Sequence, residues 1–277
     1  MGKVAFIADY FIDELPLGGA EQCNEVILSL LPFEVDKHKT ENLTIEEVQD
    51  YDFLIISNHM NLSVALKEFI TNNKRYIVIE HDFGCLITRD VSIYEDGIAP
   101  VSHLIDSDFY RNAKKVFLQS DPHLRAWVNN TGLPNLISLK ANPYSEKDIE
   151  TILSISKDVI KKEYSAILDH PFWQKNTKGS VHFCKTNNIK YEVIPRLGKL
   201  EYIKKLSTYS SLVFLPLVFE SFSRVCCEAA LCGLKIYSNQ NISFTQSEYK
   251  GLKGEDLARF LLNNNSIILE KILREIA

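Results

Sequence analysis

The sequence lacks an apolar run long enough to cross a membrane. Its richest apolar segment, residues 211–219, is short and contains Pro216, whereas a membrane helix needs about 20 apolar residues. The sequence also starts on a strand-like segment, KVAFIADY, without the apolar core of a signal peptide. Phe6 breaks the N-myristoylation pattern that Gly2 would begin. We therefore expect a cytoplasmic protein with no integral membrane segment.

Metal-ligand patterns are also lacking. The six cysteines form no C-x-x-C motif and have no histidines at zinc spacing, so we expect buried, reduced thiols. The segment Asp106-Ser107-Asp108 spells D-x-D, a short pattern that can hold a metal ion. Here it precedes a short helical segment, which favours helix capping and a favourable dipole interaction. We expect no metal site.

An excess of positive charge is missing as well. The net charge is −5 and the pI about 5.8, which disfavours a basic protein that binds nucleic acid or membrane surfaces. The charge is divided unevenly. Residues 1–145 hold 12 Lys/Arg against 21 Asp/Glu, whereas residues 146–277 hold 19 against 15. An anionic ligand is therefore expected in the second half.

Short apolar runs alternate with helical patterns along the whole chain. The strand-like segments are 4–8, 53–57, 76–80, 116–119, 136–139, 165–168, 191–194, 212–215 and 235–237. The helical segments lie near 19–31, 61–72, 121–131, 178–187, 199–207 and 222–232. This alternation predicts an α/β fold with parallel sheets covered by helices on both faces.

The alternation is interrupted at residues 142–162, which we interpret as the connection between two α/β domains, 1–145 and 146–277. A long amphipathic helix is predicted from about Gly254, either capping its own domain or crossing back to the first. The polar segment 263–266, NNNS, is interpreted as a break in that helix.

The segment 212–234, LVFLPLVFESFSRVCCEAALCGL, carries the strongest functional signal. A buried strand ends near Pro216, and Ser221 or Ser223 is expected to cap the following helix. Glu220 precedes this helix and Glu228 lies within it. A helix N-terminus favours phosphate, ligands of open α/β sheets bind beyond the carboxyl ends of the strands, and carboxylates accept hydrogen bonds from sugar hydroxyls. The layout suits a nucleotide with a diphosphate.

This segment resembles the E-x7-E motif of retaining glycosyltransferases of the GT-B fold (glycosyltransferase group 1, family 4-like), which reads roughly P-x3-E-x-F-x5-E-A-x3-G. The matching residues are Pro216, Glu220, Phe222, Glu228, Ala229 and Gly233. The resemblance implies two Rossmann-like domains facing across a cleft. The first, 1–145, would lie on the acceptor side, and the second, 146–277, would bind the nucleotide-sugar.

The resemblance also implies roles for single residues of the second domain. Glu228 would bind the ribose hydroxyls, and Glu220, a catalytic residue, would contact and place the sugar. Backbone N–H groups at Phe222 and Ser223 and the ammonium of Lys178 would stabilise charge on the leaving diphosphate.

One departure from the family pattern concerns the phosphate site. The family often shows an arginine in the loop before the Lys-Gly pair, and no arginine stands in the loop before Lys178-Gly179. Lys175 or His170 is a candidate replacement for this cation.

In the first domain, Gly18-Gly19 followed by Ala20-Glu21 resembles the family's glycine loop, whose backbone approaches the donor. A plain strand–helix turn is the alternative. His81 follows the strand-like YIVIE, where the family places a histidine facing the donor sugar; a structural histidine is the alternative. The absence of G-x-G-x-x-G disfavours a nicotinamide site.

The expected function is therefore retaining transfer of a sugar from a nucleotide-sugar, with UDP-sugar as the donor implied by the family, and with no cofactor or metal. The acceptor stays open between a glycan, a lipid-linked or small molecule, and modified DNA. One alternative is a DNA glycosyltransferase acting on hydroxymethylated bases of viral DNA. Two others are a non-catalytic nucleotide-sugar-binding protein on a degenerate GT-B scaffold and a sugar-nucleotide epimerase.

Overall fold

The computed structural model describes residues 2–12 and 18–277, and the chain forms two compact units. Unit 1 comprises Met1–Pro143 and Asn264–Ala277, and unit 2 comprises Tyr144–Asn263. The first boundary lies two residues before the one expected from the sequence. The last fourteen residues belong to unit 1 rather than to the second domain, which differs from the expected division at 146–277.

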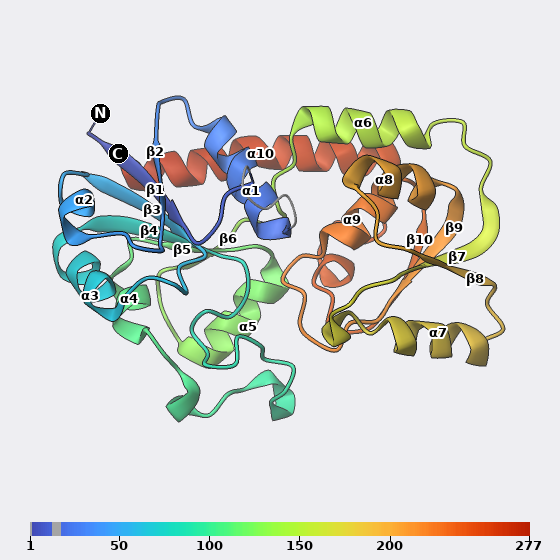
Figure 1. The fold of residues 1–277 in the computed structure, drawn as a ribbon, viewed down its shortest axis with the longest axis horizontal. Coiled ribbons are helices and arrows are strands. Elements are labelled where there is room, and N and C mark those ends of the chain that lie inside the picture. The colour runs from blue at the N-terminus through green and yellow to red at the C-terminus, as the bar shows by residue number, and fades with distance from the viewer. Residues whose placement is uncertain (1, 13–17) are drawn as a thin grey trace. The chain divides into compact units, whose positions relative to one another are not determined.

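Unit 1 is built on a parallel six-stranded sheet with the order β2-β1-β3-β4-β5-β6 (Figure 1). Its strands are β1 (Val4–Ala8), β2 (Asp36–Lys39), β3 (Phe53–Ser57), β4 (Arg75–Glu80), β5 (Val116–Leu118) and β6 (Leu136–Ser138). The central strands are fully buried and apolar, which is typical of parallel sheets covered on both faces. The sequence did not predict β2, because its residues, DKHK, are polar and form an exposed edge strand.

The helices of unit 1 begin in different ways, and a serine or threonine side chain caps three of those that the structure describes. The helices are α1 (Gly19–Leu30), α2 (Ile45–Gln49), α3 (Val64–Asn73), α4 (Ser107–Asn112) and α5 (Asp121–Thr131), with the 3-10 turns η1 (Glu95–Gly97) and η2 (Val101–His103). The Ser63 hydroxyl accepts a hydrogen bond from the Leu66 N–H, so α3 begins three residues later than the expected 61–72 segment.

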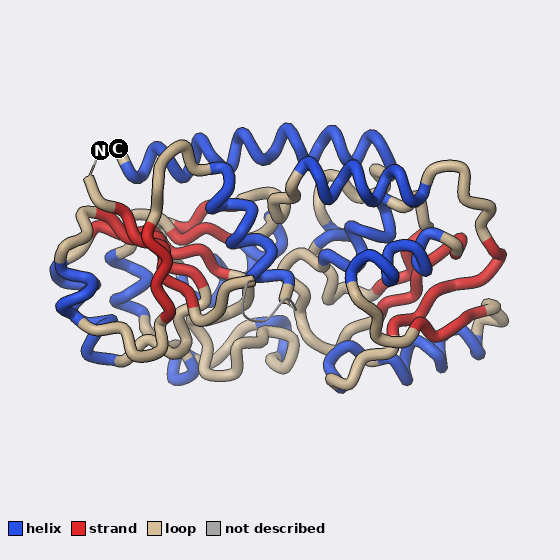
Figure 2. The backbone as a smooth tube through the Cα atoms, turned by 45° about the horizontal axis from the view of Figure 1, so that its top comes forward, coloured by secondary structure: helices blue, strands red, loops and turns tan. Residues whose placement is uncertain are grey.

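Unit 2 has a parallel four-stranded sheet with the order β10-β9-β7-β8. Its strands are β7 (Lys162–Leu168), β8 (Tyr191–Ile194), β9 (Tyr209–Phe214) and β10 (Lys235–Ser238). Its helices are α6 (Glu146–Ser156), α7 (Thr177–Thr186), α8 (Lys199–Ser207) and α9 (Arg224–Leu231). The 3-10 turns are η3 (Trp173–Lys175) and η4 (Phe244–Gln246). Helices α6, α8 and α9 pack together on one face of the sheet, and α7 covers the other (Figures 1 and 2). The carboxyl ends of all four strands share one edge.

Helix α10 (Gly254–Ile276) runs without interruption through the NNNS segment, so the interpretation of residues 263–266 as a helix break is wrong. The Asn264 side chain is buried and donates hydrogen bonds to the carbonyls of Leu139 (2.9 Å) and Ala141 (3.3 Å). This contact outweighs the weak helix propensity of asparagine. Ile268 and Ile272 enter the core of unit 1. Within residues 2–12 and 18–277, no helix combines the length and apolarity needed to span a membrane.

Candidate functional site

In unit 2, the loops that follow β7 and β9 are held together as one surface at the carboxyl edge of the sheet. The Asn176 side chain donates a hydrogen bond to the Leu215 carbonyl (2.8 Å), and the Leu217 N–H donates to the Gln174 carbonyl (2.8 Å). Both contacts join the first loop to the second. The two loops therefore present their side chains in a fixed relation to each other.

Glu220 is fixed at this edge by both its backbone and its side chain. Its N–H donates to the Asn241 carbonyl (2.7 Å), and its own carbonyl accepts from the Ser243 N–H (3.1 Å). The carboxylate pairs with the Lys175 ammonium at 2.6 Å. Both side chains of this pair remain partly exposed. The site therefore offers a positioned carboxylate–ammonium pair that a ligand can reach.

Helix α9 begins at Arg224, two residues later than the 222–232 segment expected from the sequence. The reason lies at Ser223, whose φ of 76° and ψ of 83° are left-handed, a conformation that a non-glycine residue adopts rarely. Its side chain makes no capping hydrogen bond to α9, so the expected serine cap does not form. The N–H groups in the first turn of a helix have no partner within that helix, and a helix N-terminus of this kind favours an anionic ligand.

Phe222 does not contribute its side chain to the ligand surface. It is buried, and its ring packs against those of Phe244 (centroids 5.8 Å apart) and Tyr249 (6.2 Å). The backbone carbonyl of Phe222 accepts a hydrogen bond from the Phe244 N–H (3.1 Å). This aromatic cluster anchors the loop that leads into α9.

Glu228 lies on α9 and is only 6% exposed. Burial raises the pKa of its carboxyl group, while the charges of Arg224 and Lys199 lower it. Lys199 begins α8 and also pairs with Asp148 of α6 at 2.8 Å. Glu228 therefore lies on the face of the sheet that α6, α8 and α9 cover. Within the described chain, no hydrogen bond ends on its carboxylate, which leaves it able to accept hydrogen bonds from a ligand.

Further cationic side chains follow neighbouring strands at the same edge. Lys178 lies exposed in the first turn of α7, and its ammonium makes no ion pair with the residues that the structure describes. Arg196 follows β8. Burial lowers the pKa of His170, and the charges of Lys175 and Arg196 lower it further, so these groups lie near one another. The sheet order brings the loop after β8 next to the loop after β7.

Arg196 was missed by the sequence analysis, which considered only the loop before Lys178. The signal that would have found it is topological: parallel strands place all their carboxyl-end loops at one edge. The sequence analysis offered Lys175 as a replacement for the missing arginine. In the structure, Lys175 is already paired with Glu220. Arg196 is therefore a further candidate for the phosphate-binding cation.

In unit 1, His81 lies directly after β4 and contacts α1. Its Nε2 atom lies 2.9 Å from the Ser57 hydroxyl and 3.1 Å from the Asn24 carboxamide oxygen. Burial lowers the pKa of His81 to about 4, and the nearby His123 contributes to that decrease. The imidazole is therefore neutral at pH 7.

Gly18 and Gly19 form the start of the same helix α1, with Gly18 as its N-cap residue. The structure thus places the glycine pair and His81 in one unit, joined through α1. The Glu21 carboxylate folds back over Gly18, where a side chain would contact it. An anionic group approaching Gly18 requires this carboxylate to swing away.

A buried polar network supports the segment that carries His81. The Glu80 carboxylate accepts a hydrogen bond from the Tyr110 hydroxyl (2.8 Å) and lies 3.0 Å from His59 Nε2. These contacts lower the pKa of Glu80 against the opposing effect of burial. At Gly84, an added Cβ would lie 2.5 Å from the Tyr110 hydroxyl. The turn from Glu80 to Gly84 is therefore packed closely over the network.

Asp82 is held on both its backbone and its side chain. Its carbonyl lies 2.7 Å from His123 Nε2 and accepts a hydrogen bond from Trp127 Nε1 (3.0 Å). Its carboxylate pairs with Arg89. Burial raises the pKa of the Asp82 carboxyl to about 6, although the charge of Arg89 opposes this effect. A neutral histidine and a carboxyl of raised pKa thus stand side by side after β4.

The D-x-D segment has a different role from the one expected. Asp106 is the residue before α4, but its side chain does not cap the helix. Its carboxylate pairs instead with Lys67 at 2.6 Å. Within residues 2–12 and 18–277, no group of three His, Cys, Asp or Glu side chains is placed to hold a metal ion.

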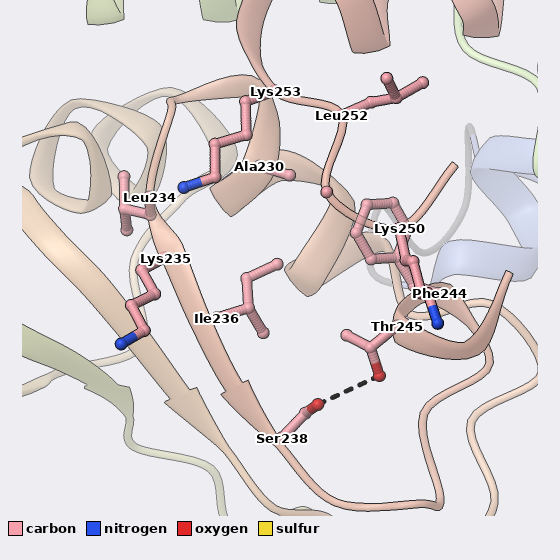
Figure 3. A pocket seen from close by; sticks show the side chains of 11 residues that line it. Ala230, Leu234, Lys235, Ile236, Ser238, Phe244, Thr245, Lys250, Leu252 and Lys253 are labelled. Atoms are coloured by element: carbon pink, nitrogen blue, oxygen red, sulfur yellow. Dashed lines mark hydrogen bonds between the residues drawn. The ribbon is translucent and has the colours of Figure 1, made fainter. Parts of the chain in front are cut away.

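Figure 3 shows a separate cavity of about 220 Å³ alongside the edge strand β10. Lys235, Lys250 and Lys253 line it around an apolar interior, and the Ser238 hydroxyl donates a hydrogen bond to the Thr245 hydroxyl (3.0 Å) at one end. Its lining includes neither glutamate of the carboxyl-edge site, so it is not part of that site.

This chain is similar in structure to several known proteins. No family model and no curated protein matches the sequence. Among solved structures, AviGT4, a glycosyltransferase involved in avilamycin A biosynthesis, matches with a TM-score of 0.58 and 12% identity, over 99% of this chain and 97% of AviGT4. Alr3699/HepE of Anabaena in complex with UDP matches with a TM-score of 0.53 and 14% identity, over 99% of both chains.

The sucrose-phosphate synthase of Thermosynechococcus elongatus matches with a TM-score of 0.52 and 11% identity, over 98% of this chain and 94% of that protein. At such low identities, the likeness shows the fold. The predicted α/β architecture, with two Rossmann-like units of the GT-B fold, is confirmed.

Proposed function

We propose that this chain is a retaining, metal-independent glycosyltransferase that moves a sugar from a UDP-sugar to an acceptor. The observation that carries the proposal is the arrangement of Glu220. Its carboxylate is paired with Lys175 just ahead of α9, and Glu228 lies on α9 itself. The fold, and the UDP bound in the HepE structure, support a nucleotide-sugar as the donor.

In this proposal the donor lies along the carboxyl edge of the unit 2 sheet. The diphosphate binds at the N-terminus of α9 (Arg224–Leu231), where the helix dipole and the backbone N–H groups favour an anion. Lys178 and Arg196 supply positive charge. Glu228 accepts hydrogen bonds from the ribose hydroxyls, because charged acceptors form strong bonds to hydroxyl donors.

The chemical step breaks the bond between the anomeric carbon and the diphosphate oxygen, and UDP leaves with the electron pair. The cations and the α9 N–H groups stabilise the charge that develops on this leaving group, which is often the largest catalytic contribution. The acceptor oxygen then bonds to the anomeric carbon on the face that UDP leaves, and its proton passes to the departing diphosphate. Glu220 places the sugar during this step.

The proposal gives the residues of unit 1 a supporting role at the sugar. Neutral His81 is suited to hydrogen bonding with a sugar hydroxyl, since its pKa of about 4 keeps it uncharged. The backbone at Gly18 and Gly19 offers close approach without side chains in the way, once the Glu21 carboxylate has moved.

The two glutamates are tested by separating donor binding from turnover. We expect Glu228→Gln to weaken UDP binding about tenfold or more, because a hydrogen bond to a charged group contributes about 1.5–3 kcal/mol. We expect Glu220→Gln to lower kcat by about 10²-fold or more while UDP affinity changes little. Isothermal titration with UDP and a transfer assay measure the two effects.

Glu163→Gln is the matched control, because Glu163 lies exposed in the amino half of β7, away from the carboxyl edge. Unchanged UDP affinity in Glu228→Gln would remove the ribose role. UDP-sugar binding without hydrolysis or transfer would favour a non-catalytic binding protein. Transfer to hydroxymethylated DNA with a steep dependence on salt would identify DNA as the acceptor.

A further inference from the structure

The cavity alongside β10, which we call the β10 cavity, combines an apolar interior with basic side chains and lies wholly within unit 2 (Figure 3). The lining that the structure describes contains no aspartate or glutamate. A site of this composition suits an anion that carries an apolar body. The residues that matter here are the apolar Leu234, Ile236 and Phe244 and the basic Lys235, Lys250 and Lys253.

Two of these lysines have ammonium groups that a ligand can engage. The Lys235 ammonium lies 4.5 Å from the ring centroid of Tyr237 and is held there by a cation–π contact. Lys250 and Lys253 are exposed and form no ion pair with the residues that the structure describes. Burial lowers the pKa of Lys161, and the charge of Lys253 lowers it further, so these two cations lie near each other. An anion at Lys253 relieves this repulsion.

The size of the β10 cavity limits the ligand. Its volume is about 220 Å³, whereas an apolar cavity of about 150 Å³ already holds a benzene molecule. A six-membered ring with one attached group therefore fits. Pockets for drug-sized ligands and cofactors measure about 300–1,000 Å³, so the β10 cavity is too small for a nucleotide.

One wall of the β10 cavity is joined directly to the segment that holds Glu220. Phe244 and Thr245 belong to this wall. The Phe244 N–H donates a hydrogen bond to the Phe222 carbonyl (3.1 Å), and the Ser243 N–H donates one to the Glu220 carbonyl (3.1 Å). The rings of Phe244 and Phe222 also pack together. A ligand that packs against this wall therefore stabilises the backbone on which Glu220 is held.

We propose that the β10 cavity is a regulatory site for a small carboxylate or phosphate whose apolar body is about the size of a phenyl ring. The body packs against Ile236 and Phe244, and the anionic group pairs with Lys253, with Lys250 adding positive charge. Occupancy stabilises the turn at 243–245 and so the backbone of Glu220. The site itself is independent of the proposed function, whereas its effect on sugar transfer rests on that function.

The test uses phenyl phosphate, titrated calorimetrically into the full chain. Phenol and inorganic phosphate carry only the ring or only the charge, and we expect each to bind about tenfold more weakly or worse. Lys253→Gln is expected to weaken phenyl phosphate binding about fivefold, and Lys250→Gln/Lys253→Gln about tenfold or more. Hydrogen exchange at the Ser243 and Phe244 amides is expected to slow when phenyl phosphate is bound, because the ligand stabilises their hydrogen bonds.

Lys185→Gln is the matched control, because Lys185 is exposed near the end of α7, which covers the other face of the sheet (Figure 1). Inorganic phosphate that binds as tightly as phenyl phosphate, or binding that the double variant leaves unchanged, indicates an adventitious ion only and overturns the proposal. Displacement of phenyl phosphate by UDP also overturns it, since the probe then occupies the donor site. Unchanged exchange at Ser243 and Phe244 overturns the coupling to Glu220. If Lys253-dependent binding occurs but UDP does not bind, the β10 site stands and the proposed function fails.

Discussion

Ser223 combines an unusual backbone conformation with a position at the proposed diphosphate site. Left-handed backbone costs a non-glycine residue about 1–2 kcal/mol, and strain of this kind persists where surrounding structure or function requires it. The Ser223 carbonyl accepts a hydrogen bond from the Cys227 N–H (3.2 Å), so the strained residue still accepts the first hydrogen bond of α9.

The strain at residue 223 predicts that glycine stabilises the fold there. We expect Ser223→Gly to raise the free energy of unfolding by about 0.5–1 kcal/mol, because glycine adopts positive φ without penalty. Ser223→Val is expected to lower it, since a β-branched side chain fits this conformation poorly. Urea denaturation of both variants measures the effect, and a destabilised glycine variant would show that the serine side chain matters more than the strain.

At this scale, the sequence predicted the positions of Glu220 and Glu228 relative to helix α9 better than it predicted their contacts. The motif placed Glu220 before a helix and Glu228 within it, because strand, loop and helix are local features of the sequence. The pairing of Glu220 with Lys175 joins residues 45 apart and depends on how two loops fold. The proximity of Arg196 depends on sheet order, which no local pattern encodes.

The turn after β4 is the element whose packing is most restrictive. Gly84 faces the Tyr110 hydroxyl and the Glu80 carboxylate at distances that leave no room for a methyl group. We expect Gly84→Ala to lower the free energy of unfolding by about 1–3 kcal/mol, as overpacking does. In a Tyr110→Phe background the same change is expected to cost less, because the closest atom has gone. Equal costs in both backgrounds, measured by urea denaturation, would contradict the contact.

The same element makes the stability of unit 1 sensitive to acid. Burial holds the pKa values of His81 and His123 at about 4, below the ordinary value of about 6.5. The unfolded chain therefore binds more protons between pH 6.5 and 4, and the free energy of unfolding falls as the pH falls through this range. Asp82, with a pKa of about 6, acts in the opposite direction below pH 6, because the folded state takes up its proton first.

Asp82→Asn separates these contributions. Without the opposing carboxyl, the free energy of unfolding is expected to fall more steeply between pH 6 and pH 4 than it does in the unmodified chain. Urea denaturation at half-unit pH steps measures the slope. A slope equal to that of the unmodified chain would show that Asp82 does not titrate with a raised pKa in the folded state.

Helix α10 contributes residues to both units of the molecule. The sequence predicted the helix but not the unit to which its second half belongs. Its amphipathic pattern predicted a helix from Gly254, but the pattern is the same whichever core it enters. The sequence therefore left open whether it returned to the first domain. The carbonyls that accept hydrogen bonds from Asn264 belong to Leu139 and Ala141, more than 120 residues away in the sequence. Local helix propensity therefore could not predict that the helix continues through Asn264.

The packing of α10 gives a prediction for unit 1. Ile272 is 1% exposed within the core cluster, so we expect Ile272→Ala to lower the free energy of unfolding by about 2–5 kcal/mol. Ile267, on the same helix but largely exposed, is the control, and Ile267→Ala is expected to change stability by less than about 0.5 kcal/mol. Thermal denaturation compares the two, and equal effects would argue against this orientation of the helix.

Each unit contains one tryptophan, so intrinsic fluorescence can distinguish the two units. The chain has two tryptophans: Trp127 is fully buried in unit 1, and Trp173 is largely exposed in unit 2. Blue-shifted emission therefore comes from unit 1, and quenching by iodide acts first on unit 2. A single fluorescence experiment on the unmodified chain can thus follow the unfolding of unit 1 through Trp127 while the exposure of Trp173 in unit 2 is measured by quenching.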